Sequence, residues 1–531
     1  MMSCNLKCGD REGFCGRVYP AIFRVILSFV EVDKHNGRCI VTIVSPGYPS
    51  LSTLNPKTAL NHPSETENPR ANLGFVILVS GVAALGGFLF GYDSGCINGA
   101  IDALQETFQT GSLGSGFNVA SMLLGCAAGA FMAGNLADRF GRKAILYASA
   151  MLFAVSAWGS GVSTGSTMFI AFRLIGGFAV GAASVISPAY ISEIAPEKYR
   201  GRLTSLQQMA IVLGLFLAFF CNWLIADAAG GASEEFWWGY AAWRWMFWVE
   251  LVPVALFFVG LLLIPESPRY LIAVGRNDQA EKILQKVSPS KNMAAKIEEI
   301  RKSVSRKSKP RFSDMIDRST GKVHPIVWVG ISIAALQQLV GINVVFYYGA
   351  VLWKAAGFDE ADALKINVIG GVINVVSTLV AIGLVDKWGR KPLLLLGSAG
   401  MTIFLGALAV IFGAAGSGPG GNLELSGAAG IAALVCANAY IVMFGISWGP
   451  VMWVMLGEMF PNRFRGAALA VAGLTQWGAN FTVTMTFPLL LAGIGLGGAY
   501  GLYASFALIS FFIVKAIVRE TKGLSLEEMG Q

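Results

Sequence analysis

Long apolar runs separated by short polar loops recur along most of the chain. Each run is about 20 residues long, the length at which an α-helix crosses about 30 Å of hydrocarbon. The pattern therefore predicts twelve membrane-spanning helices. The first six lie at about 73–95, 116–137, 144–163, 167–190, 203–225 and 245–264. The second six lie at about 325–350, 366–385, 392–413, 429–456, 467–491 and 497–518.

A polar segment divides these spans into two sets of six. It runs from Pro265 to Lys322, is rich in Lys and Arg, and contains helix-forming stretches such as Asp278–Val287. We therefore expect an N-terminal six-helix half at 73–264, a cytoplasmic helical linker at 265–324, a C-terminal six-helix half at 325–518 and a short cytoplasmic tail at 519–531.

Residues 1–72 follow a different pattern. The apolar stretch from Val18 to Val30 is too short to span a membrane easily, and it carries Arg24 near its middle. An Arg at that depth costs about 2.5–3.5 kcal/mol or more. From Ser45 to Arg70 the composition turns to Pro, Ser, Asn and Glu, as in disordered segments. We expect a disordered leader, or sequence upstream of the true start, and assign it no function.

The composition excludes a large soluble enzyme. Hydrophobic residues make up 54% of the chain and charged residues 14%, whereas a soluble protein has about 25% charged residues because its surface must be solvated. The three histidines, His35, His62 and His324, lie beside no nucleophile or ligand cluster, so no catalytic constellation emerges. We therefore expect a protein that is not an enzyme.

The cysteines give no sign of a metal site. No nearby Cys/His pair completes a zinc-like spacing. Four cysteines lie in apolar segments, where a free thiol behaves as a small hydrophobe: Cys96, Cys126, Cys221 and Cys436. We expect no metal, no disulfide framework and no cofactor.

The formal net charge of +8 reflects topology rather than nucleic-acid binding. Basic residues cluster in loops on alternate sides of the apolar runs, which is the positive-inside pattern. These loops are at 139–143, 198–202, 269–322, 387–391, 463–465 and 519–522. Both termini and the linker are therefore predicted to be cytoplasmic, in an inner or plasma membrane.

Two short motifs occur once in each half. Asp-Arg-Phe-Gly-Arg-Lys at 138–143 follows span two, and Asp-Lys-Trp-Gly-Arg-Lys at 386–391 follows span eight. A Glu-x-x-Pro-x-x-x-Arg-Gly motif follows span four at 193–201 and span ten at 458–466. Two repeats with a site between them are what alternating access requires.

The paired acids and arginines of these motifs indicate a cytoplasmic gate. Positive-inside bias alone would not need the acids. Ion pairs across the bundle would hold the cytoplasmic side shut while a central site faced outward. The candidate gate residues are Asp138, Arg139, Arg142, Glu193, Arg200, Asp386, Arg390, Glu458 and Arg465.

Amide and aromatic side chains concentrate in particular spans. Amides offer donors and acceptors without net charge, which suits a neutral polyhydroxy compound, and Trp and Tyr add apolar faces. They are Gln207 and Gln208 in span five, Gln337, Gln338, Asn343, Tyr347 and Tyr348 in span seven, Asn374 in span eight, Trp448 and Trp453 in span ten, and Gln476, Trp477 and Asn480 in span eleven. The alternative is that these groups only bond helix to helix, which suits single residues better than the whole set.

Three charged residues lie within predicted spans. Asp93 ends the first span, Arg173 begins the core of span four and Glu250 lies in span six. An acid held within the membrane needs a partner or a proton. An acid with a movable Arg can load and release protons, although a static ion pair is the alternative.

The chain resembles the sugar porters of the major facilitator superfamily over about residues 73–528. The signatures that carry the resemblance are Asp-Arg-x-Gly-Arg-Lys at 138–143, Pro-Glu-Ser-Pro-Arg at 265–269, Gln-Gln-Leu-Val-Gly-Ile-Asn at 337–343, Asp-Lys-x-Gly-Arg-Lys at 386–391 and Glu-Thr-Lys-Gly at 520–523. Two departures, Arg519 in place of Pro and Ile382 in place of a small residue, concern the cytoplasmic face.

The resemblance implies an all-α membrane protein with twelve transmembrane helices in two pseudo-symmetric halves. It also implies sugar contacts at Gln208, Gln337, Gln338, Asn343, Tyr347, Trp453, Gln476 and Trp477, and we extend the site to Asn374 and Asn480. In the similar bacterial proton–xylose symporters, the residues that match Asp93, Arg173 and Glu250 form a proton relay.

The sequence therefore predicts an alternating-access transporter of a monosaccharide, working by proton symport. Its partners would be a small-molecule sugar and membrane lipid, with no nucleic acid, and it would act as a monomer. An uncoupled sugar facilitator, a polyol or quinate transporter and a non-transporting membrane sugar sensor remain alternatives.

Overall fold

The computed structural model describes residues 30–35, 38–43, 72–196, 199–287, 292–305, 312–316, 320–417, 423–425, 427–461 and 463–522. The chain divides into two units, residues 1–66 and 67–531. In the first unit, β1 (Val30–His35) and β2 (Arg38–Ile43) form an antiparallel pair. The segment predicted as a leader thus contains one hairpin, and the rest of that prediction lies outside the described residues.

The second unit is built from helices. The N-terminal half contains α2 (Leu73–Cys96), η1 (Ile97–Gly99), α3 (Ile101–Phe108), α4 (Ser112–Phe140), α5 (Arg142–Val162), α6 (Ser166–Ile194), α7 (Arg200–Ala229), β3 (Glu235–Trp237), β4 (Tyr240–Ala241), α8 (Ala242–Trp248) and α9 (Leu251–Leu263). The segment that follows contains α10 (Pro268–Ala273), α11 (Asn277–Val287), α12 (Met293–Ser305) and η3 (Phe312–Met315). The C-terminal half contains α13 (Pro325–Leu339), α14 (Ile342–Tyr347), α15 (Gly349–Ala355), α16 (Glu360–Trp388), α17 (Arg390–Ala414), β5 (Gly416–Ser417), β6 (Leu423–Glu424), α18 (Gly427–Gly445), α19 (Trp448–Met459) and α20 (Arg465–Ile517).

These helices supply the twelve predicted spans. Eleven helical stretches among the described residues are long and apolar enough to cross a membrane. The last of them, α20, has 53 residues, and Gly495 inside it is non-helical (φ 68°). A 53-residue helix would be about 80 Å long, far more than one bilayer crossing needs. It therefore contains two spans, and the all-α, twelve-helix prediction is confirmed.

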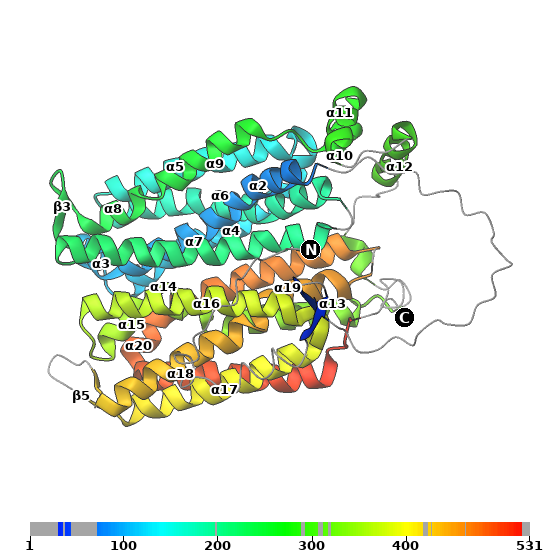
Figure 1. The fold of residues 1–531 in the computed structure, drawn as a ribbon. Helices are drawn as coiled ribbons and strands as arrows, with labels where there is room; N and C mark the ends of the chain where they lie inside the picture. The colour runs from blue at the N-terminus through cyan, green and yellow to red at the C-terminus, as the bar shows by residue number, and fades with distance from the viewer. Residues whose placement is uncertain are drawn as a thin grey trace. The chain divides into compact units, whose positions relative to one another are not determined.

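The spans of each half lie together as a bundle, and the two bundles lie side by side (Figure 1). The helices α10, α11 and α12 lie at one end of the bundles, which we call the linker end. The strand β3 and the helix α3 lie at the opposite end, which we call the hairpin end. The start of α2 and the end of α20 both lie at the linker end.

Close packing of α4 against α6 depends on four glycines, Gly125, Gly129, Gly177 and Gly181. A Cβ atom added to Gly177 would lie 1.9 Å from the main-chain oxygen of Met122, and the other three would meet main-chain oxygens at 2.1–2.2 Å. Because lipid chains are as apolar as Leu, such close backbone approach is a main source of attraction between membrane helices. This glycine seam holds the core of the N-terminal half together.

Three spans that the sequence predicts as continuous are broken in the structure. Span six divides into α8 and α9 around Glu250, span seven into α13 and α14 at Gly341, and span ten into α18 and α19 before Trp448. Gly341 and Ser447 have non-helical backbone. Val249 and Glu250 keep right-handed helical angles, so span six is interrupted rather than unwound. Non-helical backbone at membrane depth is tolerated where it is buried in protein. Discontinuous helices of this kind mark binding sites in many transporters.

The glycine seam gives a stability prediction. Gly177→Ala should force α4 and α6 apart and lower the free energy of unfolding by about 1–3 kcal/mol, the usual cost of overpacking. Gly406→Ala on α17 is the matched control, because a Cβ there meets nothing within 4 Å. Thermal unfolding in detergent should show a lower midpoint for Gly177→Ala alone. Equal midpoints for the two variants would contradict the seam.

Candidate functional site

Four amide side chains form a hydrogen-bonded cluster, which we call the amide cluster: Gln337, Gln338, Asn343 and Gln476. Gln337 Nε2 donates to the main-chain oxygen of Trp448 (3.0 Å), and Gln338 Nε2 donates to Gln337 Oε1 (2.9 Å). Asn343 Nδ2 donates to Gln338 Oε1 (2.5 Å), and Gln476 Nε2 to Gln337 Oε1 (3.4 Å). The cluster joins α13, α14 and α20 to the start of α19.

The break at Gly341 allows α13 and α14 to contribute to one cluster. Gly341 has φ 83°, a left-handed conformation that favours glycine, and a Cβ there would lie 2.6 Å from the ring of Tyr503. Five residues separate Gln338 from Asn343, which on a continuous helix would point them in different directions. The bend brings their side chains into contact.

The other predicted substrate residues lie around this cluster. Asn480 is one turn beyond Gln476 on α20 and accepts a bond from Thr484 (3.1 Å). Tyr347 is buried near the side chains of Asn480 and Ser94. Trp477 contacts Phe90 of the N-terminal half, with the ring centroids 5.8 Å apart.

The structure does not join Gln208, Asn374 or Trp453 to the amide cluster by a hydrogen bond between described residues. Gln208 is half-buried on α7, and its neighbour Gln207 is buried with no partner for either polar side-chain atom in the part of the chain that the structure describes. Asn374 is buried on α16. Trp453 is 41% exposed although it lies within a membrane span.

A buried ion pair lies in the N-terminal half. Arg173 on α6 pairs with Asp93 near the end of α2, and both are about 1% exposed. Arg173 Nη2 also donates to the main-chain oxygen of Asp93 (3.2 Å). Among the described residues, the second carboxylate oxygen of Asp93 has no partner, and neither carboxylate oxygen of Glu250, at the break between α8 and α9, has one. The structure thus brings together the three residues predicted for coupling.

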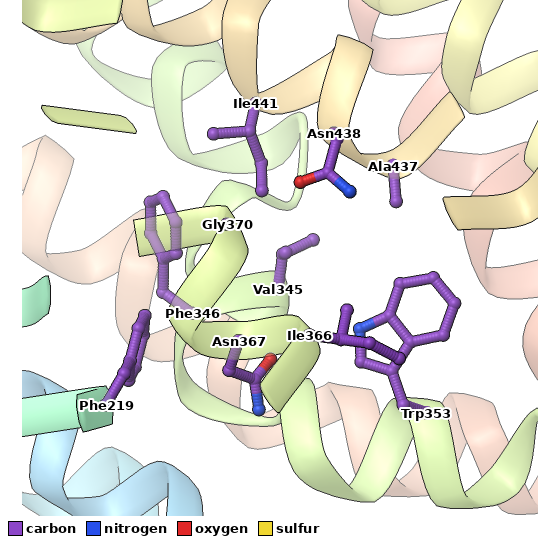
Figure 2. A pocket seen from close by; sticks show the side chains of 10 residues that line it. All are labelled: Phe219, Val345, Phe346, Trp353, Ile366, Asn367, Gly370, Ala437, Asn438 and Ile441. Atoms are coloured by element: carbon purple, nitrogen blue, oxygen red, sulfur yellow. The ribbon is translucent and has the colours of Figure 1, made fainter. Parts of the chain in front are cut away.

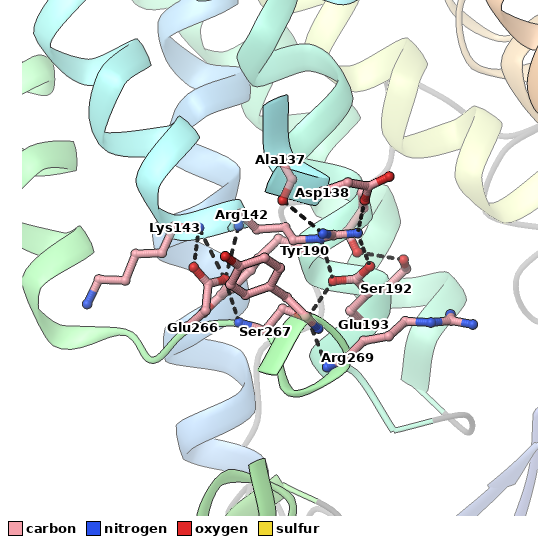
Figure 3. Close-up of polar contacts among 12 residues, drawn as sticks. Ala137, Asp138, Arg142, Lys143, Tyr190, Ser192, Glu193, Glu266, Ser267 and Arg269 are labelled. Carbon is pink, nitrogen blue, oxygen red and sulfur yellow. Dashed lines mark hydrogen bonds and ion pairs between the residues drawn. The ribbon is translucent and has the colours of Figure 1, made fainter. Parts of the chain in front are cut away.

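A second group of charges lies at the linker end (Figure 3). Arg142, at the start of α5, pairs with Glu193 (3.1 Å) and with Asp138 (3.2 Å). The carboxylate of Glu266 accepts main-chain N–H bonds from Arg142 (3.1 Å) and Lys143 (3.1 Å). Ser267 Oγ donates to Glu193 Oε2 (2.5 Å), which ties the end of span six to the ends of spans two to four.

The C-terminal half repeats this arrangement. Arg390, at the start of α17, pairs with Glu458 (2.7 Å) and with Asp386 (3.2 Å). Glu520 accepts main-chain bonds from Arg390 and Lys391, both at 2.9 Å. Thr521 Oγ1 donates to Glu458 Oε2 (2.6 Å). We call each of these two equivalent networks a clasp.

The clasps place the predicted gate residues within a half rather than across the bundle. The ion pairs of Asp138, Glu193, Asp386 and Glu458 all stay inside one half. The other arginines of the set make no ion pair among the described residues: Arg139 lies over Phe140, Arg465 donates to the main-chain oxygen of Phe460, and Arg200 begins α7.

The sequence analysis missed Glu266 and Glu520 as clasp residues. A signal was available, because Glu266-Ser267 follows the last span of the first half and Glu520-Thr521 follows the last span of the second. The two motifs were used only as family signatures. Their contact with the start of α5 and α17 depends on tertiary structure, which spacing along the chain does not reveal.

Direct contacts join the two halves at the hairpin end. Asn98 of η1 donates to the main-chain oxygen of Phe346 (2.7 Å), and its Oδ1 accepts from Ala350 (3.2 Å) and Asn367 (2.9 Å). Two further bonds cross between the halves nearby, Lys354 to Asp102 (2.7 Å) and Ala232 to Glu360 (3.0 Å).

A small cavity of about 10 Å³ lies in the same region, lined by Phe219, Phe346 and Asn367 among others (Figure 2). A cavity of this size holds about one water molecule. It is too small for a sugar, so it is part of the seam between the halves rather than the substrate site.

The fold and these sites define a secondary transporter. Two equivalent bundles meet around broken helices and buried amides, and a charged group is held at membrane depth. The chain belongs to the family described as Sugar (and other) transporter, whose sequence profile matches residues 79–531. The resemblance noted in the sequence is confirmed: this is a major facilitator transporter, not an enzyme.

Relatives that are named as transporters align with most of the chain. A protein named Glucose transport protein, from Synechocystis, is 55% identical over 471 residues, which cover 88% of this chain and 100% of the relative. The D-xylose-proton symporter of Escherichia coli is 37% identical over 496 residues, covering 87% and 96%. The major myo-inositol transporter of Bacillus subtilis is 35% identical over 467 residues, covering 87% and 94%.

Solved structures of the xylose transporter XylE from Escherichia coli share the fold. An inward-open conformation has a TM-score of 0.73 at 35% identity and covers 86% of this chain and 99% of that chain. The proton:xylose symporter bound to 6-bromo-6-deoxy-D-glucose has a TM-score of 0.69 at 36% identity, covering 86% and 99%.

The clasp of the C-terminal half predicts a pH dependence. Burial favours the neutral form of Glu520, but main-chain N–H groups of Arg390, Lys522, Lys391 and Thr521 outweigh it and hold the pKa of this carboxyl below its usual value. The stabilisation is therefore complete above the unfolded pKa of about 4.3 and is lost as the pH falls through the folded pKa.

Glu520→Gln should accordingly unfold at a lower temperature than the wild type at pH 7, and the difference should shrink below about pH 4. Glu299→Gln, at an exposed position on α12, should match the wild type at every pH. Thermal unfolding in detergent between pH 7 and pH 3.5 measures this. A difference that stays constant across the range would show that the Glu520 carboxylate does not stabilise the clasp.

Proposed function

We propose that this protein is a proton-coupled monosaccharide symporter that works by alternating access as a monomer in an inner or plasma membrane. The observation that carries the proposal is the buried Asp93–Arg173 pair with the unpartnered carboxyl of Glu250 beside it. Names of relatives support it, since they include proton symporters of xylose and arabinose. A single chain supplies every residue of the proposed site, which supports function as a monomer.

The linker end is assigned to the cytoplasm. The basic loops that lead into α5 and α17 lie there, as the positive-inside rule requires of the cytoplasmic side. The first span begins in α2, which starts at Leu73, and the last span ends in α20, which finishes at Ile517. Both helix ends lie at the linker end, which supports cytoplasmic termini.

We infer that the proposed sugar site faces the cytoplasm in this conformation. The bonds of Asn98 and the Lys354–Asp102 pair close the hairpin end, while the clasps tie each half only to itself. The TM-score of 0.73 to an inward-open conformation of the xylose transporter supports this assignment. Outward opening would require the contacts of Asn98 to break.

The sugar would bind at the amide cluster. Gln476 Oε1 is buried with no partner among the described residues, and such groups cost about 1–3 kcal/mol each unless satisfied. Sugar hydroxyls, which both donate and accept, would satisfy them. The exposed ring of Trp453 would add an apolar face for the C–H surface of the sugar.

Coupling would follow from the constant charge of Arg173. A guanidinium does not lose its proton in proteins, so Arg173 needs an anion at all times in a buried site. A proton that binds Asp93 removes this anion, and Glu250 would replace it after giving up its own proton to the cytoplasmic side. Ser94 and Tyr347 lie between Asp93 and Asn480, which would link this exchange to the sugar.

The first test measures the external pH of weakly buffered, de-energised vesicles when glucose and then xylose are added. Symport predicts alkalinisation in step with sugar entry, because protons leave the medium with the sugar. Asp93→Asn should abolish the pH change. Glu250→Gln should spare exchange of sugar across the membrane but block uphill uptake.

Each contrary result identifies one alternative. Sugar entry without a pH change would make the protein a facilitator with a static Asp93–Arg173 pair. Intact uphill uptake in Glu250→Gln would remove Glu250 from the relay. Entry of neither sugar would direct the search to polyols, which the name of the myo-inositol relative keeps open, and to quinate.

The second test concerns the amide cluster. Gln338 bonds both Gln337 and Asn343, so Gln338→Ala should disorder the cluster and weaken sugar binding at least about 100-fold, the loss of two or more buried hydrogen bonds. Asn438→Ala on α18, outside the cluster, is the control. Binding measured by calorimetry in detergent should separate the two variants, and unchanged affinity in Gln338→Ala would move the sugar site elsewhere.

A further inference from the structure

Cys96 lies at the coupling site, although its sequence context suggested only a small hydrophobe. It is the last residue of α2 and is completely buried. Its sulfur lies 3.2 Å from the main-chain oxygen of Asp93 and 4.0 Å from Asp93 Oδ1. One ligand atom from each of Asp93, Cys96 and Glu250 lies within 4.8 Å of the other two.

Three oxygens at this site have no partner among the described residues. Asp93 uses Oδ1 for Arg173, which leaves Oδ2 without a bond. Both oxygens of Glu250 are also unbonded, and the residue is 1% exposed. These buried carboxylate oxygens and the nearby thiol are electron-pair donors, and together they could act as ligands to a cation.

We propose that Asp93, Cys96 and Glu250 bind one thiophilic divalent cation, of which Cd²⁺ and Zn²⁺ are the examples, and that the bound cation stops transport. One thiolate and two carboxylates are a ligand set that such cations accept, with water or substrate completing four ligands. Hard cations such as Mg²⁺ favour oxygen ligands in an octahedron and would bind poorly here. The inhibitory effect rests on the proposed function, but the binding site does not.

Binding of the divalent cation in exchange for two protons leaves the net charge of the site unchanged. An isolated buried carboxylate is costly, so unpaired Glu250 is accommodated as the neutral acid, and the buried thiol of Cys96 is neutral as well. Binding of M²⁺ would release one proton from each: M²⁺ plus Cys–SH plus Glu–COOH gives the complex plus two H⁺. Arg173 keeps its bond to Asp93 Oδ1, while Oδ2 becomes the third ligand.

Inhibition follows from the same geometry. The ligands come from α2 and from the break between α8 and α9. A cation would fix these two segments to each other. It would also occupy both acids that the proposed relay protonates, so neither proton loading nor release of Arg173 could occur.

The test uses the full chain in a background where Cys4, Cys8, Cys15 and Cys39 are replaced by Ser. Addition of CdCl₂ in detergent should give the ultraviolet thiolate-to-cadmium charge-transfer band, saturating at one ion per chain. Cys96→Ala should lose the band and weaken Cd²⁺ binding at least tenfold. Cys126→Ala, which removes another completely buried thiol on α4, should keep both.

Transport is measured separately as sugar counterflow, which needs no proton gradient. Cd²⁺ and Zn²⁺, but not Mg²⁺, should inhibit the background protein and the Cys126→Ala variant, and Cys96→Ala should be at least tenfold less sensitive. Matching unfolding temperatures without metal would show that Cys96→Ala is folded.

A band that persists in Cys96→Ala, or no band in the background protein, would overturn the metal site. A Cys96-dependent band without any inhibition would keep the site and overturn its effect on transport. Absence of all sugar transport, with the band intact, would refute the proposed function and leave the site standing.

Discussion

The bond between Arg173 and Asp93 is the interaction on which the rest of the N-terminal half depends. A guanidinium stays charged at any physiological pH, and its burial among membrane helices is tolerable only with an anion in contact. The surroundings are shaped to allow this contact. A Cβ atom at Gly176 would lie 2.2 Å from Ser156 Oγ, which is a clash, and 3.2 Å from Asp93 Oδ2, so a side chain there would crowd the carboxylate. The ring of Phe247 covers the guanidinium at 5.7 Å and excludes lipid and water from it.

The polar contacts at the hairpin end of the bundles differ from those at the linker end. At the hairpin end a few hydrogen bonds and one half-exposed ion pair link the halves, and such bonds are individually worth only about 1 kcal/mol. At the linker end each clasp combines two carboxylates, an arginine and several main-chain donors within a single half. The halves also pack directly on each other, α4 against α20 and α7 against α16. Because the clasp ion pairs stay within one half, these helix contacts can change while each bundle moves as a rigid body, which is the motion that alternating access needs.

The sequence was enough to predict the twelve spans, because the bilayer imposes a length and an apolar composition that any reader of the chain can recognise. It also identified Gln337, Gln338, Asn343 and Gln476, since amides at membrane depth are unusual enough to be noticed one by one. It did not predict the breaks in the helices. Gly341 resembles the other glycines of the spans in sequence, and only the structure shows that Tyr503 packs against it. Contacts between segments that are distant in sequence could not be predicted either. The contacts of the clasp acids and the proximity of Cys96 to Glu250 depend on the packing of the helices, which the local spacing of residues does not reveal.

The equivalence of the two clasps bears on how the two halves evolved. Glu266 and Glu520 lie 254 positions apart, yet each follows the sixth span of its own half and returns to the start of the third. Both accept bonds from two successive main-chain amides that follow a glycine with φ above 90°, at Gly141 and Gly389. A shared detail of this kind implies that the clasp existed before the halves were joined. The ancestral six-helix unit could already close upon itself, and gene duplication then supplied a second copy of a part that was structurally complete.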